Sequence, residues 1–416
     1  MELKRATVRD IRRRNRSVLL SELFFSGPLS RLELSRLTGL SAATASNVTA
    51  DLIAERLIVE AGQVESDGGR PRVLLRVDPG YGHVIGIDVG ETGVKVELFD
   101  LAMTRLATVD EPLPCSRPDP AAVADQVAAG IHKVIVVAGV TRASVMAAGI
   151  GVPGMVEQGA TALVHAPTIG WHAVELERML RDRGMTLPLF IDNGAKTQGQ
   201  AEMWFGAGRG ARHAVIVLVG SGVGAAVVNN GAIFRGVSSS AGEWGHTTIV
   251  YGGRQCRCGA RGCLEAYVGA EGVLDRYRRA RGGRPLPGDD EISQIRALVA
   301  AADTAKVAAN LLDDTAGLLG AGIANLINLF NPERVVLGGW AGLAIGERML
   351  PGIRAAARAN ALAHPFGQTT IELCELGPDA VAFGAATLPV AELLARGGDP
   401  RHAGAAESGS ATAIGA

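Results

Sequence analysis

The sequence of 416 residues predicts an α/β protein with a small helical module at its N-terminus. Two observations predict this fold class. After residue 80, short apolar runs that end in glycine turns alternate with helical patterns, as in α/β lobes. Before it, two helical segments joined by a glycine precede two strand-like runs, the order of a winged helix–turn–helix. We expect domains at residues 1–80 and 81–395, and a disordered tail rich in glycine, alanine and serine at residues 396–416.

The first part of the module is predicted to be two helices around a turn. Ser30 is suited to cap the first helix, because Glu33 follows at the spacing of a capping box. Gly39 marks the turn, and Ser41 caps a second helix that runs to about Arg56. Small helical hairpins without a role in DNA binding share this pattern, so the segment alone leaves both interpretations open.

The second helix is the element that a helix–turn–helix places in the major groove of DNA. Strands at Ile58–Gly62 and Arg72–Val77 would flank a wing, and Pro71 holds Arg70 in an extended conformation suited to a narrow minor groove. The first 20 residues carry seven basic and two acidic side chains, so we expect Arg12–Arg16 to contact phosphates. The expected DNA-binding residues are Ser41, Thr44, Ser46, Asn47 and Arg70.

The rest of the chain predicts strands that alternate with helices. Helices are expected at Ala121–Val137 and Ala195–Phe205, and a glycine-rich turn at residues 220–224. The expected strands are Val84–Gly90, Val94–Phe99, Ser144–Gly151, Pro188–Asp192, Ala214–Val219, Ala225–Val228 and Arg334–Leu337.

A cysteine-rich loop is the most specific feature of the sequence. Three of the five cysteines, Cys256, Cys258 and Cys263, lie within one short glycine-containing stretch, and His246 precedes them by ten positions. Three thiolates and an imidazole complete a tetrahedral zinc site. The alternative is that these cysteines pack as small apolar residues, but their clustering argues against it. We therefore expect one structural Zn²⁺ with these four ligands.

The sequence around this loop resembles the signature of the ROK family (repressors, open reading frames, kinases). The matching residues read G-E-x-G-H followed by C-x-C-G-x-x-G-C-x-E, and L-S-R-x-E-L-S-R-x-T-G-L-S-x-x-T with a G-G-R-P wing resembles the winged helix–turn–helix of the family's repressors. The resemblance implies two lobes with the actin-like ATPase fold of sugar kinases, a homodimer or homotetramer, and a zinc loop that supports a sugar pocket. The residues that would bind the sugar are Asn193, Glu243, His246 and Glu265.

The resemblance also places two phosphate-binding turns. One is D-x-G-x-T at Asp88, Gly90 and Thr92, and the other is the glycine-rich turn at residues 220–224. The position after Gly90 is Glu91, where kinases of the family usually carry glycine. We expect a carboxylate at this position to repel a nucleotide phosphate.

The residue that would act as general base is missing. Kinases of the family carry it as the aspartate of E-N-D-x-N, and the matching stretch here is Asp192-Asn193-Gly194-Ala195-Lys196, with Gly194 at the base position. Asp192 is offset by two residues at a strand end and is not expected to replace it. Lys196 would be a solvated helix residue. The expectation is a protein without kinase activity.

Composition is that of a soluble protein, with a net charge of −1 and 20% charged residues. We expect a cytoplasmic protein without a membrane segment, because no signal-peptide pattern or membrane-length apolar run is evident and the cysteines suit a metal site. The leading hypothesis is a sugar-responsive repressor of carbohydrate genes that binds a two-fold symmetric DNA operator. The alternatives are an active sugar kinase with an added DNA-binding module, and a regulator that responds to a protein partner and no sugar.

Overall fold

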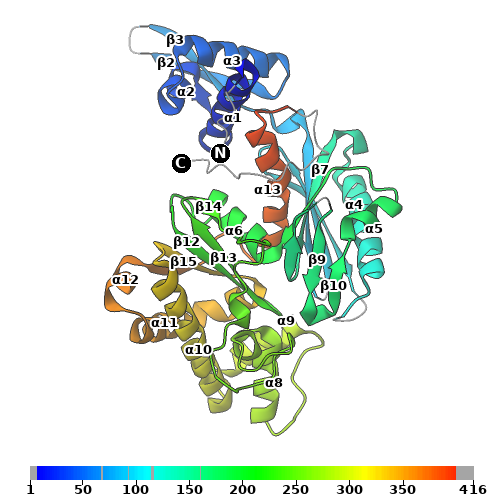
Figure 1. Cartoon of the computed structure of the whole chain (residues 1–416), viewed down its shortest axis with the longest axis vertical. Coiled ribbons are helices and arrows are strands. Elements are labelled where there is room, and N and C mark those ends of the chain that lie inside the picture. Colours follow the sequence, from blue (N-terminus) through cyan, green and yellow to red (C-terminus); the bar gives the residue numbers. More distant parts are fainter. Residues whose placement is uncertain (1–6, 67–68, 92, 114–116, 160, 400–416) are drawn as a thin grey trace.

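The computed structural model describes residues 7–66, 69–91, 93–113, 117–159 and 161–399. Three parts follow one another in space: an N-terminal module, a first lobe and a second lobe (Figure 1). The α/β fold class predicted from the sequence is confirmed, because each lobe is built on a five-stranded sheet with helices. The N-terminal module has the order of helices and strands expected of a winged helix–turn–helix.

The N-terminal module packs three helices against a small sheet. Its elements are α1 (Val8–Ser26), β1 (Leu29–Ser30), α2 (Arg31–Thr38), α3 (Ala42–Ala54), β2 (Ile58–Ser66) and β3 (Gly69–Val77). The predicted caps are confirmed: Ser30 and Glu33 form a capping box, Gly39 has φ of 70°, and the Ser41 hydroxyl accepts from the Thr44 amide at 3.1 Å. The wing strands are longer than predicted, because antiparallel pairing continues through polar residues beyond the apolar positions.

The predicted basic arm is part of α1, and two of its arginines pair with carboxylates of the module. Arg12 forms an ion pair with Asp51 of α3 at 2.7 Å. Arg16 is buried, donates both guanidinium nitrogens to Glu55, and donates Nε to the Gly397 carbonyl at 2.8 Å. Arg16 is therefore unsuited to contact a phosphate, whereas the Arg12 side chain is 65% exposed in its ion pair, so the expectation that Arg12–Arg16 contact phosphates otherwise stays a prediction.

Lobe 1 (residues 83–193) is built on a mixed sheet in the order β11-β7-β4-β5-β6. Helices α4 (Pro120–Ala138) and α5 (Leu176–Asp182) pack together, with α4 against β5 and β6, and α13 (Ala380–Ala395) packs against β4 and β7. Gly86 in β4 permits the close approach of α13, because a Cβ there would lie 1.9 Å from the Ala382 carbonyl oxygen. The strands are β4 His83–Val89, β5 Gly93–Asp100, β6 Arg105–Pro112, β7 Val145–Val152 and β11 Leu189–Asn193, with β8 Met155–Glu157, β9 Leu163–Ala166 and β10 Trp171–Val174 in a separate small sheet.

Lobe 2 contains a second mixed sheet, in the order β14-β13-β12-β15-β16, and most of the remaining helices. Its strands are β12 Ala214–Val219, β13 Val223–Asn229, β14 Ala232–Ile233, β15 Arg334–Gly338 and β16 Thr370–Leu373. Its helices are α7 Glu265–Val268, α8 Ala270–Ala280, α9 Glu291–Ala301, α10 Lys306–Phe330, α11 Trp340–Asn360 and α12 Ala363–Gln368.

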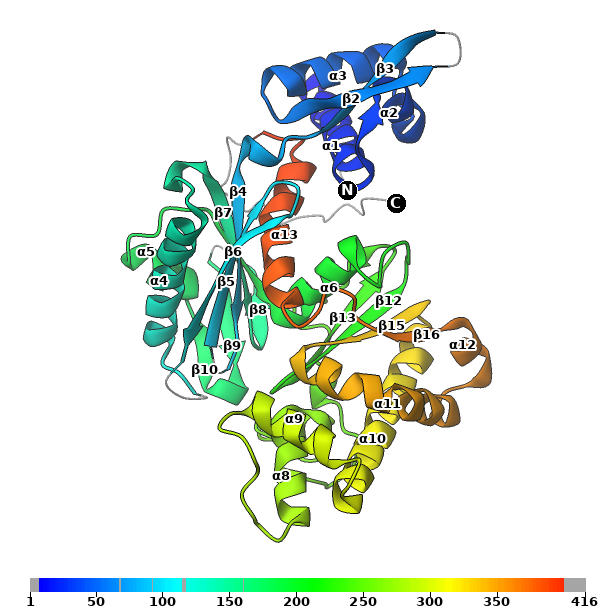
Figure 2. The ribbon, with the colours of Figure 1, turned by 180° about the vertical axis from the view of Figure 1, so that it is seen from behind.

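Two helices connect the lobes. Helix α6 (Gly194–Phe205) packs against β12 and β13 of lobe 2 and against α13, which lies on the sheet of lobe 1 (Figure 2). The order across the molecule is therefore sheet, α13, α6, sheet. Helices α6 and α13 thus form the packed layers between the two sheets.

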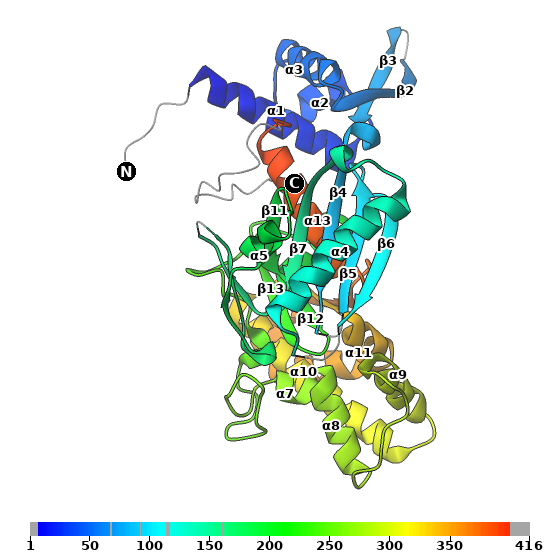
Figure 3. The ribbon, with the colours of Figure 1, turned by 90° about the vertical axis from the view of Figure 1, so that its right-hand side faces the viewer.

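The module and lobe 1 share one hydrophobic core. Leu19, Leu20 and Leu23 of α1 are buried in the same cluster as Val390 and Leu394 of α13. Figure 3 shows α13 reaching from between the lobes to α1. The residues at 396–399, which the composition assigned to a disordered tail, pack on the module, where Gly397 accepts the hydrogen bond from Arg16; the residues at 400–416 lie outside the described part of the chain.

Helix α4 is an exception to the expectation that no apolar run reaches membrane length. It has 19 residues and a mean hydropathy of 1.5, enough to span a membrane by length and composition alone. Its buried side chains Val123, Val127, Ile131 and Val134 belong to the core of lobe 1. The helix is apolar because one face covers β5 and β6.

Candidate functional site

His246 and three cysteines form a compact cluster in lobe 2. His246 ends the short 3-10 helix η4 (Trp244–His246), and the cysteines lie in the loop that leads to α7. One ligand atom from each of His246, Cys256, Cys258 and Cys263 lies within 4.8 Å of the others. Gly262, beside Cys263, has φ of 84° and lies so close to the Val250 carbonyl that a Cβ would be 1.8 Å from its oxygen. The tight turn through Gly262 is what brings the third cysteine back to the first two.

The geometry of the cluster fits a tetrahedral metal ion. His246 Nδ1 lies 3.7 Å from Cys256 Sγ, and Cys258 Sγ lies 3.8 Å from Cys263 Sγ. Two sulfurs that each bind Zn²⁺ at about 2.3 Å in a tetrahedron are about 3.8 Å apart. Burial raises the pKa of Cys256 and of Cys263, so a cation is needed to keep these groups as thiolates. The four cysteines that the structure describes are free, as metal ligation requires.

Two of the predicted sugar ligands lie beside this cluster. Glu243 directly precedes η4; burial raises the pKa of its carboxyl, and His246 and Lys196 oppose the shift. Glu265 begins α7, is buried, and accepts a hydrogen bond from the Val223 amide at 2.9 Å. His246 Nδ1 and Glu265 Oε1 lie 3.7 and 3.8 Å from Cys256 Sγ, and Glu243 directly precedes η4, so the structure brings these three predicted ligands together.

The fourth predicted sugar ligand, Asn193, occupies a structural position at the start of α6. Its Oδ1 accepts from the Lys196 amide at 3.1 Å, and its Nδ2 donates to the Gly154 carbonyl at 2.5 Å. The side chain therefore caps α6 and ties it to the turn after β7. The next residue is Gly194, where a Cβ would have ordinary contacts, the nearest being Val381 Cγ1 at 3.5 Å. The site has space for a carboxylate at this position but no residue that supplies one.

Asp192 and Lys196 are both buried, so Lys196 is not the solvated helix residue that its position suggested. Lys196 Nζ donates to the Ser239 carbonyl at 2.7 Å, and Asp192 Oδ2 accepts from Arg235 at 2.6 Å. Burial lowers the pKa of Lys196, and Asp192 and Glu243 oppose this. Because Asp192 is paired with Arg235, it is not a free base for an incoming hydroxyl.

The first glycine turn carries an ion pair. Glu91, between β4 and β5 of lobe 1, binds Arg257 of the cysteine loop through two hydrogen bonds of 2.5 and 3.1 Å. Burial raises the pKa of Glu91, and Arg257 opposes the shift. The sequence predicted a free carboxylate that repels a phosphate. In the structure Glu91 is not free, because it is paired with an arginine of lobe 2. Thr92 of the same turn lies outside the described residues.

Asp88 at the end of β4 is also perturbed. Burial raises its pKa to about 7, and Lys95 opposes the shift. Asp88 is therefore protonated more readily than an exposed carboxyl.

The second helix of the module presents a small polar surface. Ser46 and Asn47 are exposed on α3, whereas the hydroxyls of Ser41 and Thr44 lie 2.9 Å apart at the start of the helix. Arg70 lies in β3 next to the wing tip, and its side chain is outside what the structure describes. Ser46 and Asn47 are thus the predicted DNA contacts that the fold leaves free on the outer face.

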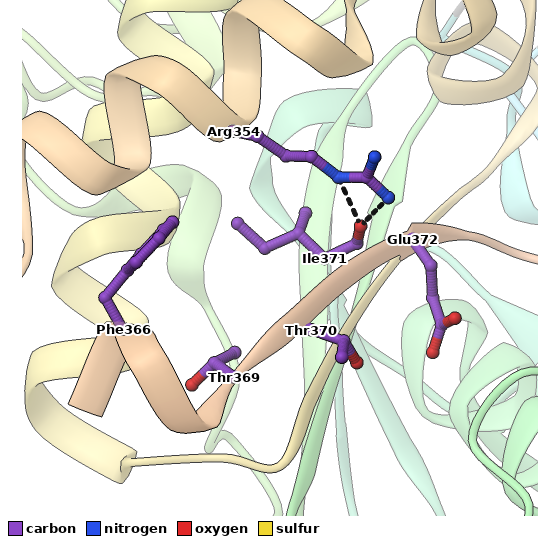
Figure 4. A pocket seen from close by; sticks show the side chains of 6 residues that line it. All are labelled: Arg354, Phe366, Thr369, Thr370, Ile371 and Glu372. Carbon is purple, nitrogen blue, oxygen red and sulfur yellow. Dashed lines mark hydrogen bonds between the residues drawn. The ribbon is translucent and has the colours of Figure 1, made fainter. Parts of the chain in front are cut away.

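A cavity of about 310 Å³ lies elsewhere, at the outer edge of lobe 2 (Figure 4). It is lined by residues of α11, α12 and β16 and of the segment between the last two, and Arg354 spans it with two hydrogen bonds to the Ile371 carbonyl. The cavity includes no predicted site residue. A smaller space of about 110 Å³ adjoins the cluster and is lined in part by Ser221, Cys256, Arg257 and Glu265.

Comparison with known proteins identifies the family of the chain. The model of the ROK family matches residues 84–392. The chain belongs to the ROK family. A xylose repressor of Caldicellulosiruptor bescii is 31% identical over 392 residues, which cover 91% of this chain and 96% of the relative. A glucokinase of Halalkalibacterium halodurans is 32% identical over 320 residues, 72% of this chain and 92% of that enzyme.

The solved structures that resemble this chain also include both a regulator and a kinase of the ROK family. A ROK family transcriptional regulator, a homologue of the E. coli MLC protein, superposes with a TM-score of 0.77 at 25% identity and covers 93% of this chain and 98% of its own. A ROK family glucokinase from Streptomyces griseus, in complex with glucose and AMPPNP, has a TM-score of 0.64 at 27% identity and covers 74% of this chain and 99% of its own. The regulator thus matches most of this chain, whereas the kinase matches about three quarters of it.

Three further residues of the site were not predicted as functional. Arg257, Arg235 and Lys196 form the buried ion pairs and hydrogen bonds that surround the predicted ligands. Arg257 lies between Cys256 and Cys258, and this position in the sequence could have indicated that the backbone of the loop fixes it. Its partner could not be deduced, because Glu91 is 166 residues away in sequence.

Proposed function

We propose that this protein is a cytoplasmic, sugar-responsive repressor of carbohydrate genes, in which residues 1–80 bind DNA and residues 81–395 bind the sugar. The observation that carries the proposal is the continuous core between α1 of the module and α13 of lobe 1, which gives a ligand in the lobes a route to the DNA-binding helices. The xylose repressor relative, 31% identical along 91% of this chain, supports the same function.

The proposed DNA contacts are Ser46, Asn47 and Arg70, with Ser41 and Thr44 at the start of the helix. A homodimer or homotetramer would present two copies of α3 to a two-fold symmetric operator, with half-sites about one helical turn or a multiple apart. Helix α3 contains no lysine or arginine, so specificity would come from asparagine and serine contacts and from groove shape.

The proposed metal is a structural Zn²⁺ bound by His246, Cys256, Cys258 and Cys263. Sulfur and imidazole ligands at tetrahedral spacing favour zinc over Mg²⁺ or Ca²⁺, which prefer oxygen. All four coordination positions would be filled by the protein, so the ion would stabilise the loop that leads to Glu265 and would not take part in chemistry.

The proposed effector is a neutral sugar or sugar derivative held near Asn193, Glu243, His246 and Glu265. Carboxylates accept hydrogen bonds from hydroxyls, and such charge-assisted bonds need no catalytic base. Asn193 would contact the sugar through the remaining lone pair of its oxygen, since the present hydrogen bonds of its amide go to the backbone.

An active sugar kinase is the second candidate, and the glucokinase relative is the observation that favours it. Against it are Gly194 at the base position, the ion-paired Asp192 and the Glu91–Arg257 pair at the first glycine turn. We therefore propose that the chain binds a sugar without phosphorylating it.

The decisive experiment has two steps. Genomic DNA fragments bound by the purified protein are sequenced, which identifies the operator and the neighbouring genes. DNA affinity is then measured with D-xylose, D-glucose and N-acetyl-D-glucosamine. We expect a two-fold symmetric site and a change in affinity with one sugar. Binding that shows no sequence preference, or the absence of any sugar response, contradicts the proposal.

A further inference from the structure

Glu91 and Arg257 join the two lobes at the point where their glycine turns face each other. Glu91 lies in the turn closed by the hydrogen bond from the Gly90 amide to the Gly93 carbonyl. Arg257 lies between two cysteines of the metal cluster in lobe 2. Their side chains are 10% and 18% exposed, so the pair is largely shielded from water.

The pair is bidentate and well supported. Both guanidinium nitrogens of Arg257 donate to Glu91, and Nη2 also donates to the Ser221 carbonyl of the second glycine turn at 3.3 Å. Glu265 lies 3.6 Å from the same nitrogen, and Glu271 lies 3.1 Å from Nε. One guanidinium thus connects the first turn, the second turn and the start of α7.

The space between these turns is where a nucleotide phosphate would be held by backbone amides, as in other anion-binding turns. Here the ion pair lines this space: a Cβ on Gly222 would lie 3.1 Å from Glu265, and within ordinary contact of Glu91 at 3.7 Å and Arg257 at 3.8 Å. A phosphate bound by Arg257 would compete with a carboxylate that already satisfies the arginine. The same pair joins lobe 1 to lobe 2.

We propose that the Glu91–Arg257 pair is an interlobe latch that takes the place of a nucleotide and positions the lobes for sugar binding in the absence of ATP. The inference rests on the proposed function for its sugar ligand. Arg257 is a positioning residue: it acts through Glu265, which it contacts, and through the angle between the lobes. The guanidinium suits this role because its planar donors bind a carboxylate through two parallel hydrogen bonds.

The test uses the full-length zinc-loaded protein and the variants Glu91→Gln, Arg257→Gln, Arg257→Lys and the Glu91→Gln/Arg257→Gln double variant. Glu91→Gln is the most informative variant, because Glu91 lies in lobe 1 and in a different loop from the proposed metal ligands. The matched control is Arg254→Gln, since Arg254 is in the same loop but pairs with Asp275 within lobe 2. Zinc content is measured in every variant.

Two readouts separate the latch from the proposed function. In the sugar-free protein, amide hydrogen exchange at residues 89–91 and 221–223 should become faster in Glu91→Gln and Arg257→Gln and stay unchanged in the control. In calorimetry with D-xylose, D-glucose and N-acetyl-D-glucosamine, the sugar that binds the wild type should bind Glu91→Gln and Arg257→Gln about tenfold more weakly. The double variant should lose no more than the worse single variant, and Arg257→Lys should lie between wild type and Arg257→Gln.

The outcomes are distinct. If the wild type binds none of the three sugars, the proposed effector class fails, and hydrogen exchange alone decides the latch. If the wild type binds a sugar and Glu91→Gln binds it equally well with unchanged exchange, the latch is overturned and the proposed function stands. Tight binding of AMPPNP to the wild type also overturns the latch if the Glu91–Arg257 pair stays formed in the complex.

Discussion

The Phe25 ring of α1 stands edge-on to the Trp204 indole of α6, with ring centroids 4.9 Å apart and planes at 88°. Phe24, Phe205 and Phe383 extend this contact into one aromatic group that joins α1, α6 and α13. Helix α6 begins at the Asn193 cap beside the candidate sugar site and ends at this group. One rigid helix therefore spans the distance from the site to the N-terminal module.

Phe25→Leu should weaken the effect of sugar on DNA binding while leaving the protein folded. Leucine stays apolar at a half-buried position, so we expect a loss of about 1 kcal/mol from the edge-to-face contacts. Fluorescence anisotropy with operator DNA, with and without sugar, measures the coupling. Phe234→Leu, at a 50% exposed phenylalanine of lobe 2, is the matched control. A full sugar response in Phe25→Leu would contradict the role of this contact.

Removal of the metal should loosen the sugar site. We expect one zinc per chain by elemental analysis, lost in Cys258→Ser or after chelation, together with a lower Tm and a weaker sugar response. The reason is that Glu265 directly follows the cysteine loop and depends on it for its position, although none of the proposed sugar ligands is altered in Cys258→Ser. Cys374→Ser is the control, since Cys374 is a buried free cysteine outside the cluster. Purified protein with no stoichiometric zinc would rule out the proposed metal.

Restoring a carboxylate at the base position should not create a kinase. Gly194→Asp fits sterically, because a Cβ at Gly194 has ordinary contacts. General-base catalysis is worth about 10²–10⁴-fold, but phosphoryl transfer requires a bound nucleotide, and the proposed role of the Glu91–Arg257 pair is to take the place of one. A coupled assay of ADP release with the sugar panel should show no sugar-dependent activity in wild type or variant. Turnover by the wild type at an ordinary kinase rate would favour the enzyme hypothesis.

DNA binding should depend on the outer face of α3 and on the wing. Asn47→Ala should cost about 1–3 kcal/mol at the preferred site and relax the preference at one base pair, if Asn47 reads a base edge. Arg70→Ala should weaken binding most at sites with an A·T-rich minor groove. Asn310→Ala changes an exposed helical asparagine of lobe 2 and serves as control. Equal affinity of Asn47→Ala and wild type for all sequences would remove this helix from base recognition.

The sequence by itself determined the features that depend on short-range spacing. The caps at Ser30 and Ser41 and the left-handed turn at Gly39 follow from residues a few positions apart, whose geometry the backbone dictates. The cluster of His246 with three cysteines comes from one stretch between positions 246 and 263. The absence of a carboxylate at Gly194 is also a property of the sequence alone.

The tertiary structure decided which charged side chains are exposed and which are paired with another residue of the chain. Arg16 meets Glu55 and Gly397, Lys196 becomes buried against Ser239, and Glu91 meets Arg257 from 166 residues away. Local patterns report the polarity of a residue but not the partner that packing brings to it. A buried charge needs a partner, because its burial without one is costly. Which residue becomes the partner is decided when the module and the two lobes pack together.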